Sequence, residues 1–226
     1  MKKIYVLIAC EESQAECQAF RDLGHIAYSC DLQPCQKRCH PEWHICGDVI
    51  PYLHGQTHFV TQNGFQRNVP RWDIIVSHPP CTYLCKSGSP LLSANANGFV
   101  WWNGWLKHVN LERYENMRKA RLFFFECLNA QAKYVAVENP LPMAIAQLPK
   151  PTCYACPSWF GSRFTKKTLY WLKNLPPLMS EIINTNATSL FASRRGKYRS
   201  RTDKCLAQAL AKQWSEFILN DEFFKI

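Results

Sequence analysis

Short apolar runs alternate along this chain with longer segments in which apolar residues return every three or four positions. The run at residues 4–9 is rich in β-branched residues, which is typical of a parallel strand buried on both faces. Comparable runs predict further strands at residues 25–30, 72–77, 134–137 and 168–172.

Helical spacing of apolar residues predicts helices at about residues 13–23, 111–132 and 203–219. In the first, Ser13 is the predicted N-cap, and Glu16 completes a capping box. Strands that alternate with helices in this way predict right-handed crossovers. We therefore expect an α/β fold in which a doubly wound, mostly parallel sheet carries helices on both faces, within a single domain.

The chemically notable residues follow the predicted strands. Asp31 follows the second strand, Pro79-Pro80-Cys81 follows the third and Glu138 follows the fourth. In open α/β sheets, ligands bind beyond the carboxyl ends of the strands. A thiol and two carboxylates at that edge therefore predict a functional site.

Two stretches between the predicted elements, residues 33–68 and 86–110, are expected to be long loops. The second is rich in Gly, Asn, Ser and Trp. A long loop beside a site often closes over it, so we expect residues 86–110 to act as a lid or substrate clamp.

Composition and charge narrow the class of protein. The hydrophobic share of 47% suffices for a core, but no apolar run approaches the roughly 20 residues that a membrane span needs. The 12 cysteines are expected to be reduced thiols in a soluble, cytoplasmic protein, because a chain of this length does not depend on disulfides. The net charge of +10 favours an anionic partner, nucleic acid above all.

The segment around Cys81 carries the clearest chemical signal. Pro79 and Pro80 fix the backbone just after a strand and present Cys81 at the edge of the sheet. A buried structural cysteine is the alternative interpretation. Glu138 ends a buried apolar strand, where a carboxylate is costly unless it binds something or its pKa is tuned.

These motifs resemble those of DNA cytosine-C5 methyltransferases. Pro79-Pro80-Cys81, followed by Gly88, has the spacing of the family's catalytic-cysteine motif, and Glu138-Asn139 resembles its Glu-Asn motif. Asp31 and Asp48 match acidic residues that hold the ribose and the adenine of S-adenosylmethionine. The motifs keep the family's order, and the chain is most similar to small methylase-like proteins of phages and prophages.

The resemblance implies a class I methyltransferase fold and transfer of a methyl group from S-adenosylmethionine to carbon 5 of cytosine in DNA. Cys81 would attack carbon 6 and form a covalent adduct, while Glu138 would bind ring nitrogen 3. The implied catalytic residues are Cys81, Glu138, Asn139 and Lys166. The implied cofactor-binding residues are Ala9, Cys10, Glu11, Glu12, Asp31, Leu32, Asp48, Val49 and Pro79.

Basic residues late in the chain are candidates for phosphate contact. Lys166 falls where the family has an Arg that contacts the cytosine. A basic loop at residues 190–202 precedes the last helix. The candidate nucleic-acid-binding residues are Arg163, Lys167, Arg194, Arg195, Lys197, Arg199 and Arg201.

The chain departs from the family pattern in two places. The glycine-rich turn after the first strand is replaced by Ala9-Cys10-Glu11-Glu12. About two dozen residues separate the strand at 168–172 from the basic loop, which is fewer than a target-recognition domain needs. Target choice would then be relaxed, or supplied by residues 86–110 or by a protein partner.

Three alternatives remain open from the sequence. The same thiol chemistry could modify a free pyrimidine nucleotide or add a group other than methyl. The fold could instead be an inactive, DNA-binding or host-interfering module. A zinc site is the third alternative, although no metal is expected because the ligand spacing is loose; its candidate ligands are Cys35, Cys39, His40, His44, Cys46, Cys153 and Cys156.

Overall fold

The computed structural model describes residues 2–37, 39–189 and 201–223 of the chain, and within these ranges the chain forms a seven-stranded sheet. From one edge to the other its strands are β10 (Cys153–Ala155), β12 (Thr168–Lys173), β9 (Tyr134–Asn139), β6 (Ile74–Ser77), β1 (Tyr5–Ala9), β2 (Ile26–Asp31) and β3 (His44–Cys46). The five strands from β9 to β3 run parallel, whereas β12 and β10 are antiparallel to their neighbours. The predicted α/β class with a doubly wound, mostly parallel sheet is confirmed.

The five strands expected from the apolar runs are all present, because each is buried on both faces. Within β1, Val6, Leu7 and Ile8 are fully buried, and β6 and β9 are almost as apolar. The chain leaves β1 for β2 on one side and returns to β6 on the other. The carboxyl ends of β1, β2, β6 and β9 therefore share one edge at this switch point.

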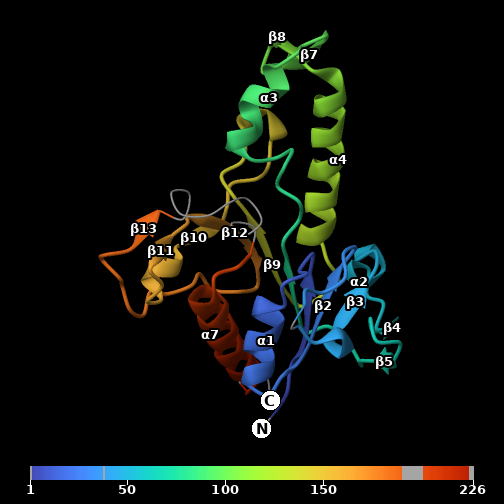
Figure 1. Cartoon of the computed structure of the whole chain (residues 1–226), viewed down its shortest axis with the longest axis vertical. Coiled ribbons are helices and arrows are strands. Elements are labelled where there is room, and N and C mark those ends of the chain that lie inside the picture. Colours follow the sequence, from blue (N-terminus) through green and yellow to red (C-terminus); the bar gives the residue numbers. More distant parts are fainter. Residues whose placement is uncertain (1, 38, 190–200, 224–226) are drawn as a thin grey trace.

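Helices cover both faces of the sheet (Figure 1). On one face, α1 (Ala15–Asp22) and α7 (Lys204–Phe223) lie side by side, and their apolar residues, such as Phe20 and Trp214, form one core cluster. On the other face, α2 (Ile50–Leu53) and α4 (Leu111–Leu128) bury Leu53 and Phe124 in a second cluster. No helix in the described ranges combines the length and the apolar composition that a membrane crossing requires.

The predicted capping box at the start of α1 is wrong. The helix begins at Ala15, and Gln14, which precedes it, has a positive φ of 55° and no side-chain capping bond. Glu11 takes the capping role, because its carboxylate accepts hydrogen bonds from the backbone N–H groups of Glu16 (2.8 Å) and Cys17 (3.3 Å). A carboxylate at this position offsets the unpaired N–H groups and the positive end of the helix dipole.

The prediction of two long loops is also wrong, since both stretches contain regular structure. Residues 33–68 form the short helix η1 (Pro41–Trp43), β3, α2 and a hairpin of β4 (His58–Val60) and β5 (Gln66–Asn68). Residues 86–110 form η2 (Lys86–Gly88), α3 (Ser89–Ser93) and a hairpin of β7 (Gly98–Trp102) and β8 (Trp105–Val109).

The second hairpin lies at the end of an arm that projects from the body of the molecule (Figure 1). We define the arm as residues 86–121, which comprise η2, α3, the β7–β8 hairpin and the first half of α4. Its turn is Asn103-Gly104, with φ of 49° and 82°, a conformation that Asn and Gly adopt readily.

Three of the remaining short elements lie near the antiparallel edge of the sheet (Figure 1): η4 (Pro157–Trp159), β11 (Phe164–Thr165) and β13 (Thr188–Ser189). The short helix η3 (Ala144–Ala146) instead contacts α4. β11 pairs with β13 in a separate two-stranded sheet.

Candidate active site

A cavity of about 580 Å³ opens at the carboxyl ends of the parallel strands. It lies within the size range typical of small-molecule sites. Nine residues predicted from the sequence line it: Cys10, Glu11, Glu12, Asp31, Pro79, Cys81, Glu138, Lys166 and Arg201. Residues distant in the sequence thus meet around one space, as the strand-end pattern predicted.

Cys81 stands on a rigid turn after β6. The two prolines before it carry no N–H group, and its carbonyl accepts hydrogen bonds from the N–H groups of Leu84 (3.0 Å) and Cys85 (2.9 Å). Burial, together with the charges of neighbouring Cys85 and Glu138, raises the pKa of the Cys81 thiol to about 11, although Lys166 opposes this shift. At neutral pH the thiol is therefore protonated unless a molecule bound in the cavity lowers its pKa.

Glu138 belongs to a buried chain of three ionisable side chains. His78 Nδ1 lies 3.5 Å from Glu138 Oε2, and His78 Nε2 lies 3.0 Å from Glu16 Oε2. Burial disfavours the charge on His78, but the carboxylates of Glu16 and Glu138 prevail and raise the pKa of His78 well above its ordinary value. His78 is therefore an imidazolium that bridges two carboxylates.

The same contact keeps Glu138 ionised. Burial opposes its charge, but the hydrogen bond from His78 and the charge of Lys166 outweigh burial and hold the pKa of Glu138 below its usual range. Its second oxygen, Oε1, has no hydrogen-bond partner among the described residues. Glu138 therefore lines the cavity with one of its oxygens buried and unpaired among the described residues.

Sequence reasoning missed the roles of His78 and Glu16. Glu16 was assigned to the capping box, yet it is fully buried on the side of α1 that packs against the sheet. Its spacing from Phe20 places it on the same helical face as that apolar residue. A carboxylate on the apolar face of a helix was thus the signal that could have identified it.

The turn after β1 forms the acidic side of the cavity. Cys10 has a φ of 62°, and the backbone N–H groups of Cys10 and Glu11 both donate to Cys30 O (2.7 and 3.2 Å). The sharp turn expected of glycines is therefore made without them. Burial and the nearby charge of Glu16 raise the pKa of Glu11 to about 7, although hydrogen bonds from the backbone N–H groups of Glu16 and Cys17 and the charge of His78 favour its ionised form.

Asp31 completes this acidic side at the end of β2. Its Oδ1 accepts a hydrogen bond from Gln33 N (2.8 Å), and burial raises its pKa. Glu12 is held beside it, since its Oε1 accepts a hydrogen bond from Gln36 Nε2 (2.8 Å). Three carboxylates thus face the cavity from one side.

Several predicted residues do not line the cavity. The Asn139 side chain is fully buried and its Nδ2 donates to Pro140 O (2.8 Å), so it fixes the turn after β9. Ala9 is buried within β1, and Asp48 is exposed with its Oδ1 accepting from Ile50 N (3.0 Å). Val49 is buried in the core, whereas the Leu32 side chain is 73% exposed.

The predicted basic residues divide in the same way. Lys166 and Arg201 line the cavity. Arg163 and Lys167 are exposed and stack over the rings of Phe164 (4.9 Å) and Tyr154 (4.1 Å). The rest of the predicted basic run lies outside the described residues, namely Arg194, Arg195, Lys197 and Arg199.

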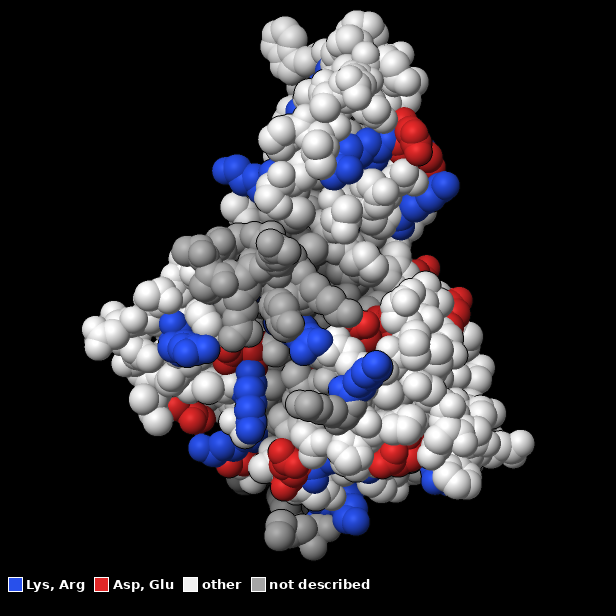
Figure 2. All heavy atoms as spheres, viewed as in Figure 1, with Lys and Arg blue, Asp and Glu red and all other residues white. Residues whose placement is uncertain are grey.

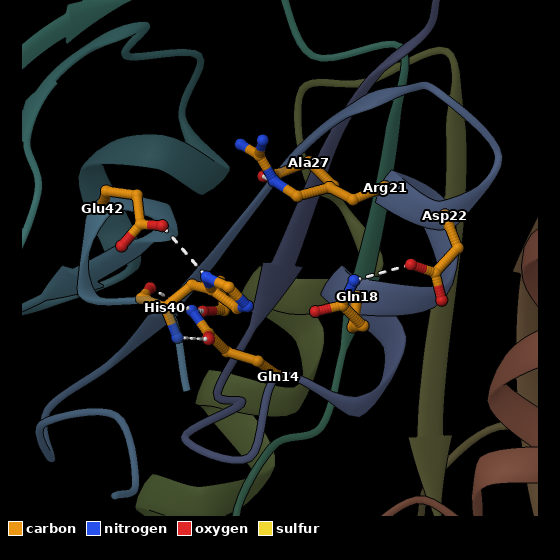
Figure 3. A network of polar contacts seen from close by, with 8 residues as sticks. Gln14, Gln18, Arg21, Asp22, Ala27, His40 and Glu42 are labelled. Carbon is orange, nitrogen blue, oxygen red and sulfur yellow. Dashed lines mark hydrogen bonds and ion pairs between the residues drawn. The ribbon is translucent and has the colours of Figure 1, made fainter. Parts of the chain in front are cut away.

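The segment that holds the first group of candidate zinc ligands packs against the start of α1 (Figure 3). Gln14 holds His40 through two hydrogen bonds, from His40 N to Gln14 Oε1 (2.7 Å) and from Gln14 Nε2 to His40 O (2.9 Å). His44 engages both ring nitrogens, with Ser29 Oγ (2.8 Å) and Gln33 O (2.9 Å). Within the described ranges, no three His, Cys, Asp or Glu side chains are grouped as metal ligands.

Comparisons with known proteins add no further constraint on this site. A scan against protein-family models finds no match for the chain. A search of curated proteins also finds no match.

Proposed function

We propose that this chain transfers a methyl group from S-adenosylmethionine to carbon 5 of cytosine in DNA, with Cys81 bonded transiently to carbon 6. The observation that carries the proposal is that Cys81, Glu138 and Lys166 line one cavity whose opposite side is acidic. Cys81 and Glu138 lie close enough for the carboxylate charge to raise the pKa of the thiol. The sequence resemblance to cytosine-C5 methyltransferases points to the same residues.

The acidic side of the cavity suits the proposed cofactor. S-adenosylmethionine carries positive charge on its sulfonium and its ammonium group, and Glu11 and Glu12 would face that charge. Asp31, at the carboxyl end of β2, stands where doubly wound folds place the carboxylate that binds a ribose. Because Glu11 already occupies the N-terminus of α1, the cofactor's carboxylate would not bind there.

Cys81 would supply the nucleophile. Carbon 5 of cytosine reacts poorly with electrophiles, but a thiolate added to carbon 6 turns the ring into an enamine. This thiol must lose its proton to water as substrate binds, and Lys166 is placed to favour the thiolate. When bound, S-adenosylmethionine would supply the methyl group that carbon 5 accepts, and S-adenosylhomocysteine would leave. Water would then take the carbon-5 proton, and the thiol would leave carbon 6 as the double bond of the ring forms again.

Glu138 would hold the pyrimidine, and His78 would control the protonation of Glu138. The adduct is stabilised by a proton on ring nitrogen 3, yet Glu138 is ionised in the resting site. The His78 imidazolium can pass its Nδ1 proton to Glu138 Oε2, and Glu138 can pass a proton to the ring. His78 is thus a positioning residue that acts through Glu138. Glu16 stabilises the charge of His78 by pairing with its other ring nitrogen, Nε2.

The test is mass spectrometry of nucleosides from DNA incubated with the protein and S-adenosylmethionine. We expect 5-methylcytosine from the unaltered chain and at least about 10³-fold less from Cys81→Ser. Cys153→Ser, on the edge strand β10 away from the cavity, is the matched control and should retain full activity. Unchanged turnover in Cys81→Ser would rule out the assigned nucleophile.

One observation favours a second candidate, an inactive methylase-like DNA-binding module. Glu11, with its raised pKa, stands where cofactor-binding folds of this type carry glycines. Titration calorimetry with S-adenosylmethionine separates the two candidates, since an inactive module would give no heat. Supplying cytosine as a free nucleotide in the same assay tests whether a polymer is needed.

A further inference from the structure

The β7–β8 hairpin presents large apolar side chains to solvent. Phe99 pairs with His108, and Trp101 pairs with Leu106, so these four residues share one face of the hairpin. Phe99 is 64% exposed, Trp101 69% and Leu106 64%. We call these four residues the aromatic face.

The opposite face of the hairpin packs against the rest of the arm, and this packing leaves the aromatic face exposed to solvent. Val109 is fully buried, and Gly98 packs so closely on Leu111 that a Cβ there would lie 2.5 Å from Leu111 Cδ1. Lys107 Nζ lies 4.9 Å above the Trp102 ring on this side. The hairpin is therefore fixed to the arm by one face, while the other is uncovered by any described part of the chain.

The arm is also positively charged. Residues 86–121 carry six Lys and Arg and two Glu. In Figure 2 the end of the arm is mostly free of charged side chains, and Lys and Arg lie along its lower part. Exposed rings beside clustered positive charge match a partner that offers both flat rings and negative charge, as the bases and phosphates of nucleic acid do.

The base of the arm is joined to both loops that bear the proposed catalytic residues. Arg113 Nη2 donates to Thr82 O (3.0 Å), next to Cys81. Lys86 N donates to Leu141 O (2.7 Å), in the loop that follows Glu138. Ser87, at the start of the arm, lines the cavity itself. A strand of nucleic acid bound along the arm would therefore lead to the cavity.

We infer that the aromatic face binds unpaired bases of single-stranded or locally opened DNA by stacking, while the Lys and Arg of the arm contact its phosphates. The arm thereby substitutes for the missing target-recognition domain and holds the strand from which one base enters the cavity. Only this last role rests on the proposed function, because stacking on the arm requires no chemistry at Cys81. An extruded or unpaired base is what the buried thiol requires.

The test is the fluorescence anisotropy of a labelled single-stranded oligonucleotide. We expect Trp101→Ala to weaken binding about 10-fold and the double variant Phe99→Ala/Trp101→Ala about 100-fold. Phe65→Ala is the matched control, because Phe65 is also an exposed aromatic residue (55%) beside an Arg, but on the β4–β5 hairpin. The control should change affinity by less than about twofold. Circular dichroism and thermal unfolding verify that all variants are folded.

Several outcomes would overturn the inference. Equal affinity of the double variant and the unaltered chain would exclude stacking at this face. Self-association that the double variant abolishes, with oligonucleotide affinity unchanged, would make the face an interface between copies. Binding to vesicles of anionic phospholipid, without binding to the oligonucleotide, would make it a membrane contact.

The methyl-transfer assay separates this inference from the proposed function. If the unaltered chain produces no 5-methylcytosine but the double variant loses oligonucleotide affinity, the inference stands and the proposed function fails. If methyl transfer depends on Cys81 but the double variant binds the oligonucleotide normally, the inference alone fails.

Discussion

We call the edge of the sheet at the carboxyl ends of its parallel strands the rim. Charged side chains are usually exposed and large apolar side chains usually buried, and the rim and the arm depart from this pattern in opposite ways. At the rim, Glu16, His78 and Glu138 are charged groups taken out of water and paired with one another. On the arm, Phe99 and Trp101 are large rings left in water. Buried charge and exposed apolar surface each cost stability, and each is commonly retained for function. We propose that the rim carries the chemistry and that the arm recognises the nucleic acid.

After Cys81→Ser, the largest effect on methyl transfer is expected from His78→Asn, also at the rim. Removing the imidazolium leaves Glu138 without its main ionic partner and without a proton source, so kcat for methyl transfer should fall by about 10²-fold. The pH profile is the specific readout. Because His78 has a raised pKa, activity of the unaltered chain should decline at alkaline pH as His78 loses its proton, and His78→Asn should lack this decline.

The control for that experiment is His54→Asn. His54 also pairs with a carboxylate, Glu126 (2.8 Å), but on the surface and outside the cavity. It should leave kcat and the pH profile unchanged. An unaltered pH profile in His78→Asn would show that His78 is only structural.

The next effect concerns stability, in Glu11→Gln. The folded-state pKa of Glu11 is raised from 4.5 to about 7, so the native state holds a proton that the unfolded state releases between these pH values. Stability from this group is therefore greatest in acid and falls as pH rises, by about 3 kcal/mol at most. Urea unfolding of the unaltered chain at pH 5 and pH 8 should show this fall, and Glu11→Gln should lack it. Parallel pH curves for the two chains would contradict the assignment.

The smallest effect is expected on the arm, from Gly104→Ala. Gly104 has a φ of 82°, so an added Cβ strains the turn by about 1 kcal/mol. The hairpin contributes little to the core, so the midpoint of global unfolding should barely move. Its amides should exchange hydrogen faster, and oligonucleotide affinity should fall several-fold.

Gly64→Ala provides the matched control for the turn, since Gly64 has a φ of 87° in the β4–β5 hairpin. It should strain that hairpin similarly and leave oligonucleotide affinity unchanged. Equal loss of affinity in both variants would show that the arm has no special role.

The two regions also differ in how far the sequence predicted them. The rim was predictable because buried parallel strands are continuous apolar runs, and Asp31, Cys81 and Glu138 stand directly after such runs. The pairing of His78 with Glu16 was not, since 62 positions separate them and only the packing of α1 on the sheet brings them together.

The arm was misinterpreted because its composition is typical of a loop. Asn103-Gly104 between two aromatic runs is a strong hairpin signal, but the exposed rings do not alternate with polar residues as in an ordinary half-buried strand. Similarly, Ser13 followed by Glu16 fits the capping-box pattern, yet the buried carboxylate of Glu11 competes successfully for the first turn of α1.

The most direct test of the central claim uses an oligonucleotide that carries 5-fluorocytosine. Fluorine replaces the carbon-5 proton that must leave before the thiol can, so an adduct at carbon 6 would be trapped after methyl transfer. Intact-protein mass spectrometry with S-adenosylmethionine present should show a covalent complex, mapped by peptide analysis to Cys81 and absent from Cys81→Ser. Methylation of ordinary cytosine without any trapped complex, or a complex mapped to another cysteine, would contradict the account.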